Sequence, residues 1–167
     1  GLALAGAALI TLGAKVQIPF WPVPMTLHTL SVFLVALTLG PRLGLAAMAA
    51  YLGAGAAGLP VFSGTPERGI GLSYMVGPTG GYLLGYLVAA GLTGWLAMGR
   101  GWIGRVLAML AGLTVVYAGG LAWLALFVPA PKLLAAGLTP FLLGDVVKVL
   151  LVATLLSGLS RLKGRDQ

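Results

Sequence analysis

The chain has 167 residues, of which 59% are hydrophobic and only 8% are charged, and its mean hydropathy is +1.05. A soluble domain carries roughly 25% charged residues, so this composition excludes an ordinary water-soluble fold and indicates an integral membrane protein. The net charge of +7 comes from basic residues scattered singly between apolar blocks, which argues against a nucleic-acid-binding face. The chain has no cysteine, which excludes disulfides and thiolate metal sites.

Long uncharged runs predict several membrane-spanning helices. They cover residues 16–41, 43–66, 69–99 and 106–131, and each exceeds the roughly 20 residues that a helix needs to cross a bilayer. Glycine, proline and charged residues divide the chain into six apolar segments, at about residues 1–16, 27–40, 43–58, 79–98, 103–127 and 140–160. We therefore predict an all-α integral membrane protein, with residues 1–167 forming a single bundle of six transmembrane helices. The first segment is short for a span, so we expect the native N-terminus to be longer or to have been trimmed.

Two connections between these segments are unusual. The sequence QIPFWPVPMT at residues 17–26 contains closely spaced prolines, which exclude helix and favour an extended backbone. The sequence LPVFSGTPERGIGLSYMVGPTG at residues 59–80 is rich in glycine and proline and long for a simple turn, so we expect a structured lid.

The basic residues predict the orientation of the bundle. In a six-span arrangement, one side of the membrane receives Arg42, Arg100, Arg105, Arg161, Lys163 and Arg165, and the other receives Lys15, Arg68 and Lys132. By the positive-inside rule the first group is cytoplasmic. We therefore expect a multi-pass protein of the cytoplasmic membrane with both termini inside and both proline- and glycine-rich connections outside.

Small residues recur at the spacing of helix-packing faces. Such faces let helices approach closely within lipid. They comprise Ala3 and Ala7; Ala46, Ala50, Ala54 and Gly58; and Gly77, Gly81, Gly85 and Ala89. We expect most of these faces to pack inside the bundle, and docking to another membrane protein is the alternative.

An acid and a base lie three positions apart in the last apolar segment, GDVVKVLL at residues 144–151. On a helix, Asp145 and Lys148 share a face and can neutralise each other. Each charge would cost roughly 2.5 to 3.5 kcal/mol at the centre of an inserted helix, so such residues usually face the bundle interior and have a function there. The pair could be a structural ion pair or include a lysine that reaches the headgroups. We favour the polar end of a small-molecule pocket.

The single histidine, His28, is a weak candidate for chemistry. A proton relay or a hydrolase would need a paired acid or nucleophile, and the sequence contains no H-E-x-x-H, G-x-S-x-G or G-x-x-x-x-G-K-[ST] motif. We therefore expect His28 to have a loop or packing role. The stretch GPTGGY is too loose to be a phosphate-binding loop.

With its segments in order, the chain resembles the BioY family, the biotin-specific S components of energy-coupling factor (ECF) transporters. The resemblance lies in PVPMTLHTLSVFLVALTLGPRLG at residues 22–44, YLGAGAAGLPVFSGTPERGIG at 51–71, GPTGGYLLGY at 77–86 and GDVVKVLL at 144–151. It covers nearly the whole chain. His28 is a departure, because the family pattern has glutamine there.

This resemblance implies a six-helix subunit that captures biotin from outside and passes it to an energy-coupling module. That module consists of a transmembrane T component and two ABC-type ATPases, so ATP is used by partner subunits and no cofactor is implied. The resemblance places Asp145 and Lys148 in the biotin site, through the family's Asp-x-x-Lys pattern. It also matches Ala3 and Ala7 to the small-residue face that docks the T component.

The chemistry of the residues fits biotin. Its ureido ring offers two N–H donors and one carbonyl acceptor beside an apolar thioether ring and a carboxylate. Asp145 can accept from ureido N–H groups, and Lys148 can donate to the carbonyl or to the carboxylate. Phe20, Trp21 or Tyr82 can cover the rings. The sequence leaves open which end of biotin meets the charged pair.

Two further residues belong to the predicted binding site. Arg68 is a second candidate for the biotin carboxylate, although a solvated loop position paired with Glu67 is an equal alternative. Thr79 lies in GPTGGY together with Tyr82. No residue is predicted to be catalytic or to ligate a metal.

Three other functions stay open. A transport subunit for a different vitamin would share the bundle and differ in pocket polarity. A small intramembrane enzyme would use His28 and Asp145 on a lipid or acyl substrate. A purely structural membrane subunit would tolerate the loss of Asp145 and Lys148 together.

Overall fold

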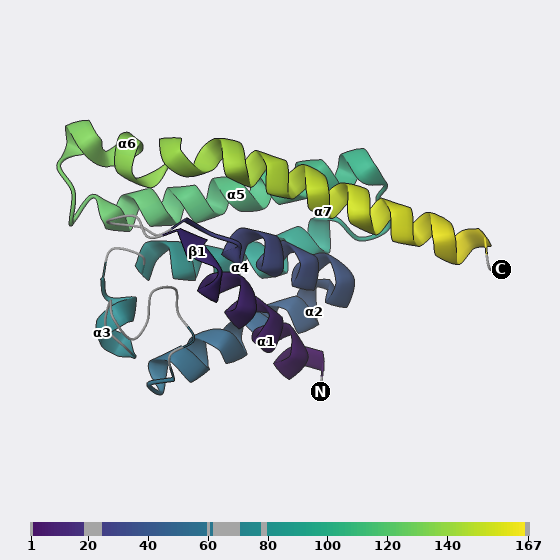
Figure 1. The fold of residues 1–167 in the computed structure, drawn as a ribbon, viewed down its shortest axis with the longest axis horizontal. Coiled ribbons are helices and arrows are strands. Elements are labelled where there is room, and N and C mark those ends of the chain that lie inside the picture. The colour runs from purple at the N-terminus through teal and green to yellow at the C-terminus, as the bar shows by residue number, and fades with distance from the viewer. Residues whose placement is uncertain (1, 19–24, 60, 62–70, 78–79, 166–167) are drawn as a thin grey trace.

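The computed structural model of the chain describes residues 2–18, 25–59, 61, 71–77 and 80–165. Helices dominate this part of the chain (Figure 1). The α-helices are α1 (Leu2–Lys15), α2 (His28–Ala56), α3 (Leu72–Met75), α4 (Gly80–Leu96), α5 (Trp102–Leu124), α6 (Leu133–Gly137) and α7 (Thr139–Arg165), and η1 (Ala130–Lys132) is a 3-10 turn. Two short strands, β1 (Gln17–Ile18) and β2 (Met25–Thr26), pair antiparallel.

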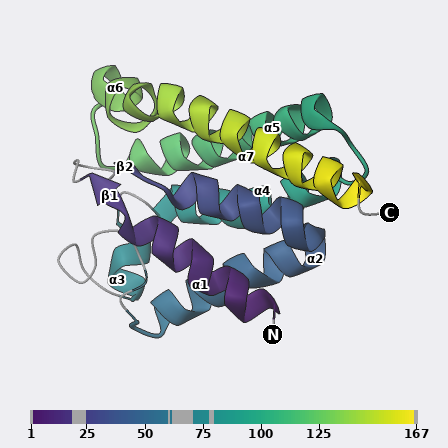
Figure 2. The same cartoon turned by 45° about the vertical axis from the view of Figure 1, so that its right-hand side comes forward.

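Helix α2 is folded back on itself at Gly40. This residue has φ 88° and ψ 175°, outside the helical region, and Pro41 follows it without a backbone N–H. A Cβ atom on Gly44, in the second half, would lie 3.0 Å from the Cα of Ala36 in the first half, so the two halves are in close contact. Figure 2 shows the second half returning beneath the first. The described residues therefore contain six apolar helical segments, namely α1, the two halves of α2, α4, α5 and α7, which confirms the predicted six-helix bundle.

Several of these helices are shorter than the uncharged runs suggested. Helix α5 and residues Phe141–Leu159 of α7 are each long and apolar enough to cross a membrane, whereas α1 and α4 are shorter apolar helices. The two halves of α2 are also short individually, because the glycine and proline at residues 40 and 41 interrupt the run. Short helices fit a bilayer by local thinning or by shielding from their neighbours.

The tightest helix pair is α4 with α5, and glycine makes it possible. A Cβ atom on Gly81 would lie 2.3 Å from the carbonyl oxygen of Gly119, and one on Gly85 would lie 2.8 Å from the Cα of Val116. The backbones thus touch without intervening side chains, as in other small-residue interfaces within lipid. The expectation that this small-residue face packs inside the bundle is confirmed for Gly81, Gly85 and Ala89, which are buried.

The first helix packs against both halves of α2. A Cβ atom on Gly13 would lie 1.8 Å from Ser31 Oγ, and one on Gly6 would lie 2.8 Å from Ala47 Cβ. The face formed by Ala46, Ala50, Ala54 and Gly58 is different, because Ala46 is exposed and the other three are only partly buried. The second half of α2 instead buries Gly44, Ala47, Met48, Tyr51 and Gly55.

The irregular elements gather at one end of the bundle. In both views, β1, α3 and α6 lie at the left, whereas the two chain termini lie toward the right (Figures 1 and 2). The described ends of QIPFWPVPMT form the β1–β2 pair, with Gln17 opposite Thr26 and Ile18 opposite Met25. This agrees with the extended backbone predicted there. Helix α7 begins at this same end. Its first residue is Thr139, so Asp145 and Lys148 lie in its second and third turns.

Candidate functional site

The charged pair on α7 faces the bundle, with Asp145 buried and Lys148 partly buried. The Lys148 Nζ atom lies 3.4 Å from Asp145 Oδ1, and the side chains are 18% and 7% exposed, respectively. The structure therefore confirms that residues i and i+3 are neighbours on this helix. Asp145 is the deeper partner, and the more exposed lysine can reach toward a ligand.

A second helix reaches the same carboxylate. The hydroxyl of Tyr117, on α5, donates a hydrogen bond to Asp145 Oδ2. Among the described residues, each carboxylate oxygen thus has one partner, and a carboxylate can accept about four hydrogen bonds in total. Acceptor positions therefore remain for N–H donors of a ligand.

Two further polar groups come from α2 and α4. Thr29 Oγ1 and the Tyr86 hydroxyl share a hydrogen bond. Tyr86 packs against the buried cluster that contains Tyr82, Tyr117 and, from α7, Val149. Residues from α2, α4, α5 and α7 therefore converge on one polar region inside an apolar bundle.

His28 belongs to this region. Its ring centroid lies 4.5 Å from that of Tyr86 and 5.2 Å from that of Tyr51, and the side chain is only 4% exposed. The packing role expected for His28 is consistent with these contacts, but the residue begins α2 rather than lying in a loop.

The Tyr82 side chain makes structural contacts that a side chain covering only a ligand ring would not need. Its hydroxyl donates a 2.6 Å hydrogen bond to the carbonyl oxygen of Gly137, at the end of α6. Its ring packs on Gly120, where an added Cβ would approach ring carbons to 2.4 Å. Tyr82 therefore connects α4 to the segment that leads into α7.

The segment before α4 is also attached to the bundle. Trp123 Nε1, on α5, donates a 2.7 Å hydrogen bond to the carbonyl oxygen of Gly77. A Cβ atom on Gly80 would lie 3.0 Å from that same Nε1 atom. The described part of the predicted lid thus includes a short helix, α3, and a fixed point beside the start of α4.

Four predicted binding residues, Phe20, Trp21, Arg68 and Thr79, lie outside the described residues, so their assignment stays a prediction. Ala3 and Ala7, the predicted docking residues, are both half-buried on α1. Ala7 packs beside the buried cluster that contains Ile10 and Met48.

The sequence analysis did not identify Thr29, Tyr86 and Tyr117. Their hydroxyl groups within apolar helices could have indicated them, because a hydroxyl buried within a membrane protein requires a hydrogen-bond partner. The chain has five tyrosines, and Tyr51, Tyr74, Tyr82 and Tyr117 are nearly completely buried.

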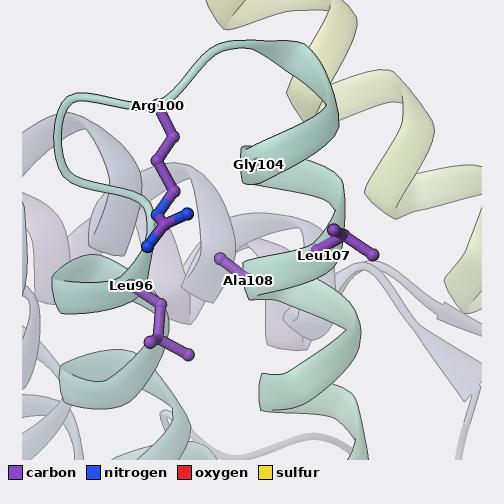
Figure 3. Close-up of a pocket in the computed structure, with 5 residues that line it drawn as sticks. All are labelled: Leu96, Arg100, Gly104, Leu107 and Ala108. Carbon is purple, nitrogen blue, oxygen red and sulfur yellow. The ribbon is translucent and has the colours of Figure 1, made fainter.

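The opposite end of the α4–α5 pair carries a small hollow of about 180 Å³ (Figure 3). It is lined by Leu96, Arg100, Gly104, Leu107 and Ala108. Only Arg100 contributes a charge, and the hollow is separate from the region around Asp145. Among the described residues, no group of three histidine, cysteine or acidic side chains could hold a metal ion.

The fold and the polar region together define a helical membrane protein with hydrogen-bonded polar side chains buried between its helices. The sequence model of the BioY family matches residues 1–165. The chain belongs to the BioY family, which confirms the resemblance drawn from its motifs.

Individual relatives agree with this assignment. The chain is 40% identical over 158 residues to the biotin transporter BioY of Thermotoga maritima, covering 93% of this chain and 92% of the relative. It is 40% identical over 141 residues to the probable biotin transporter BioY of Pyrococcus horikoshii, covering 84% of this chain and 83% of that one.

A solved structure has the same fold. The crystal structure of the S-component for biotin from an ECF-type ABC transporter superposes with a TM-score of 0.82 at 26% sequence identity. The match covers 95% of this chain and 88% of that chain. The arrangement of short and long helices is therefore that of an S component.

Proposed function

We propose that this chain is the membrane-embedded, high-affinity biotin-binding subunit of an ECF-type ABC transporter and that it serves biotin uptake. The observation that carries the proposal is the buried Asp145–Lys148 pair, joined by hydroxyls from neighbouring helices, within the fold of this family. Its relatives are transporters by name. The chain is accordingly a transport subunit and not an enzyme.

The polarity of the site supports biotin as the ligand. An acceptor carboxylate beside a lysine donor complements the N–H and carbonyl groups of a ureido ring. Aromatic side chains nearby can cover the thioether ring. In this proposal Asp145, Lys148 and Tyr82 bind biotin together with Phe20, Trp21, Arg68 and Thr79.

Transport requires partners. The sequence contains no G-x-x-x-x-G-K-[ST] motif, so ATP must be hydrolysed by another chain. We propose a T component and two ABC-type ATPases in this role, with Ala3 and Ala7 on α1 at the docking face. The excess of basic residues at one side supports a position in the cytoplasmic membrane with both termini inside.

Native mass spectrometry of the detergent-purified protein provides a direct test. We expect a bound species with the mass of biotin, or its appearance after incubation with biotin and removal of free ligand. A bound vitamin of another mass, with no exchange for added biotin, would favour an S component of different specificity. No bound species under either condition, with the protein folded, would contradict the proposal.

A further inference from the structure

The helix that carries the charged pair is attached to the bundle mainly along one narrow side. Among the residues of α7 whose burial is described, the buried side chains are Asp145, Val149, Val152, Ala153 and Leu156. Apolar packing fixes where α7 lies against its neighbours, but it does not determine how the Asp145 carboxylate is turned about its own side-chain bonds. The direction of the carboxylate is therefore set by the hydrogen bonds that it accepts.

Tyr117 supplies one of these hydrogen bonds. Tyr117 lies on α5, and among the described residues it is the partner outside α7 that donates a hydrogen bond to Asp145. The other partner, Lys148, lies on α7 itself and would move together with Asp145.

The part of α5 that carries Tyr117 packs closely against α4. The adjacent residue, Val116, is in backbone contact with Gly85 of α4, where an added Cβ would lie 2.8 Å from the Val116 Cα. A Cβ atom on Gly81 would likewise lie 2.3 Å from the carbonyl oxygen of Gly119. Backbones packed so closely cannot shift without steric overlap, so the Tyr117 hydroxyl has a fixed position relative to α4.

We propose that Tyr117 is a positioning residue for ligand recognition. Its hydroxyl holds Asp145 Oδ2, so that the remaining acceptor positions of the carboxylate face a ligand N–H group. Tyr117 acts through Asp145 and need not touch the ligand. This inference rests on the proposed function, in which Asp145 binds biotin.

The chain offers a matched control for a merely structural role. Helices α5 and α7 also share hydrogen bonds away from the site, where Trp102 Nε1 donates to Thr154 Oγ1 at 3.1 Å and Arg105 donates to Ser157 Oγ at 3.0 Å. Trp102→Phe removes one such bond between the same two helices. If Tyr117 only joined α5 to α7, Tyr117→Phe and Trp102→Phe would have the same effects on biotin affinity and on thermal unfolding.

The experiment measures biotin affinity for Tyr117→Phe, Trp102→Phe, Asp145→Asn and the double variant Tyr117→Phe with Asp145→Asn. A hydrogen bond to a charged group predicts that Tyr117→Phe weakens biotin binding about tenfold, while Trp102→Phe binds like the unaltered protein. In the Asp145→Asn background, Tyr117→Phe should have little further effect, because both substitutions disrupt one unit. The thermal unfolding of each ligand-free variant is measured in the same detergent.

The outcomes distinguish the proposed biotin site from the positioning role of Tyr117. If Asp145→Asn binds biotin normally, the binding site proposed above is wrong. If Asp145→Asn weakens binding but Tyr117→Phe does not, or if the two effects add in full, only the positioning role is overturned. Failure of Tyr117→Phe to fold, or equal loss of affinity in Trp102→Phe, would also overturn it, because the role would then be structural.

Discussion

The hydroxyl of Tyr82 on α4 donates a hydrogen bond to the carbonyl oxygen of Gly137, two residues before α7 begins. A Cβ atom on Gly137 would lie 2.4 Å from that hydroxyl and 2.5 Å from Leu124 Cδ2. The position of the first turn of α7 therefore depends on the absence of a side chain at residue 137. Since Asp145 is in the second turn, this contact connects α4 with the part of α7 that carries the proposed binding residues.

Gly137→Ala should destabilise the protein by about 1–3 kcal/mol, because the added methyl group overlaps Tyr82 and Leu124. The thermal unfolding transition in detergent would show this as a lower midpoint. Gly158→Ala is the matched control, since residue 158 lies in α7 with open space around it. Equal midpoints for the two variants would show that the segment around Gly137 adapts freely.

The α4–α5 contact predicts a second glycine effect. Gly85→Ala should separate the backbones at Val116, lower the unfolding midpoint and weaken biotin binding, because Tyr86 and Tyr117 lie next to the contact. Gly91→Ala, on the same helix, would meet Leu45 at 3.6 Å, an ordinary contact distance, and should leave binding unchanged. Normal binding by a stable Gly85→Ala protein would be incompatible with a rigid α4–α5 support.

The number and approximate bounds of the helices could be predicted because they follow from local chemistry. Apolar runs marked the segments, glycine, proline and charged residues marked the break between residues 40 and 43, and the spacing of Asp145 and Lys148 placed them on one face. The roles of Tyr86 and Tyr117 could not be predicted. Which side chains meet across helices depends on how closely two backbones approach, and sequence spacing on one helix does not determine that distance.

Tyr82 illustrates the same limit. Its residue type predicted a ring close to a ligand, and the structure places it near Asp145, yet its hydroxyl is directed to a backbone carbonyl eight positions before that residue. That carbonyl is brought close by α6, a short helix that was not distinguished in the sequence.

Lys148 gives a test of its donor role. Lys148→Met should weaken biotin binding more than tenfold, because a charge-assisted hydrogen bond in a dry site contributes roughly 1.5 to 3 kcal/mol. Lys148→Arg keeps the charge and should retain more affinity than the methionine variant. A lysine that only reached toward headgroups would give unchanged dissociation constants in both proteins.

Docking through α1 can be tested separately from binding. Ala3→Trp combined with Ala7→Trp should abolish co-purification with the T component and ATP-dependent uptake, because bulk prevents close approach of a partner helix. Biotin binding by the isolated subunit should persist. Ala8→Trp, at an exposed position on a different side of α1, should retain co-purification.

The half-buried position of Ala7 makes the paired measurement necessary. If the double tryptophan variant loses biotin binding and folding along with co-purification, this face packs within the bundle and is not a docking surface. Binding and co-purification are therefore measured on the same preparation.

The most direct measurement is the equilibrium dissociation constant of labelled biotin for the purified protein and for Asp145→Asn, which preserves the shape of the side chain and removes its charge. We predict saturable biotin binding by the unaltered protein and at least tenfold weaker binding by the folded variant, because the lost charge-assisted contact contributes roughly 1.5 to 3 kcal/mol. The same dissociation constant for both proteins would contradict the assignment of Asp145 to the biotin site.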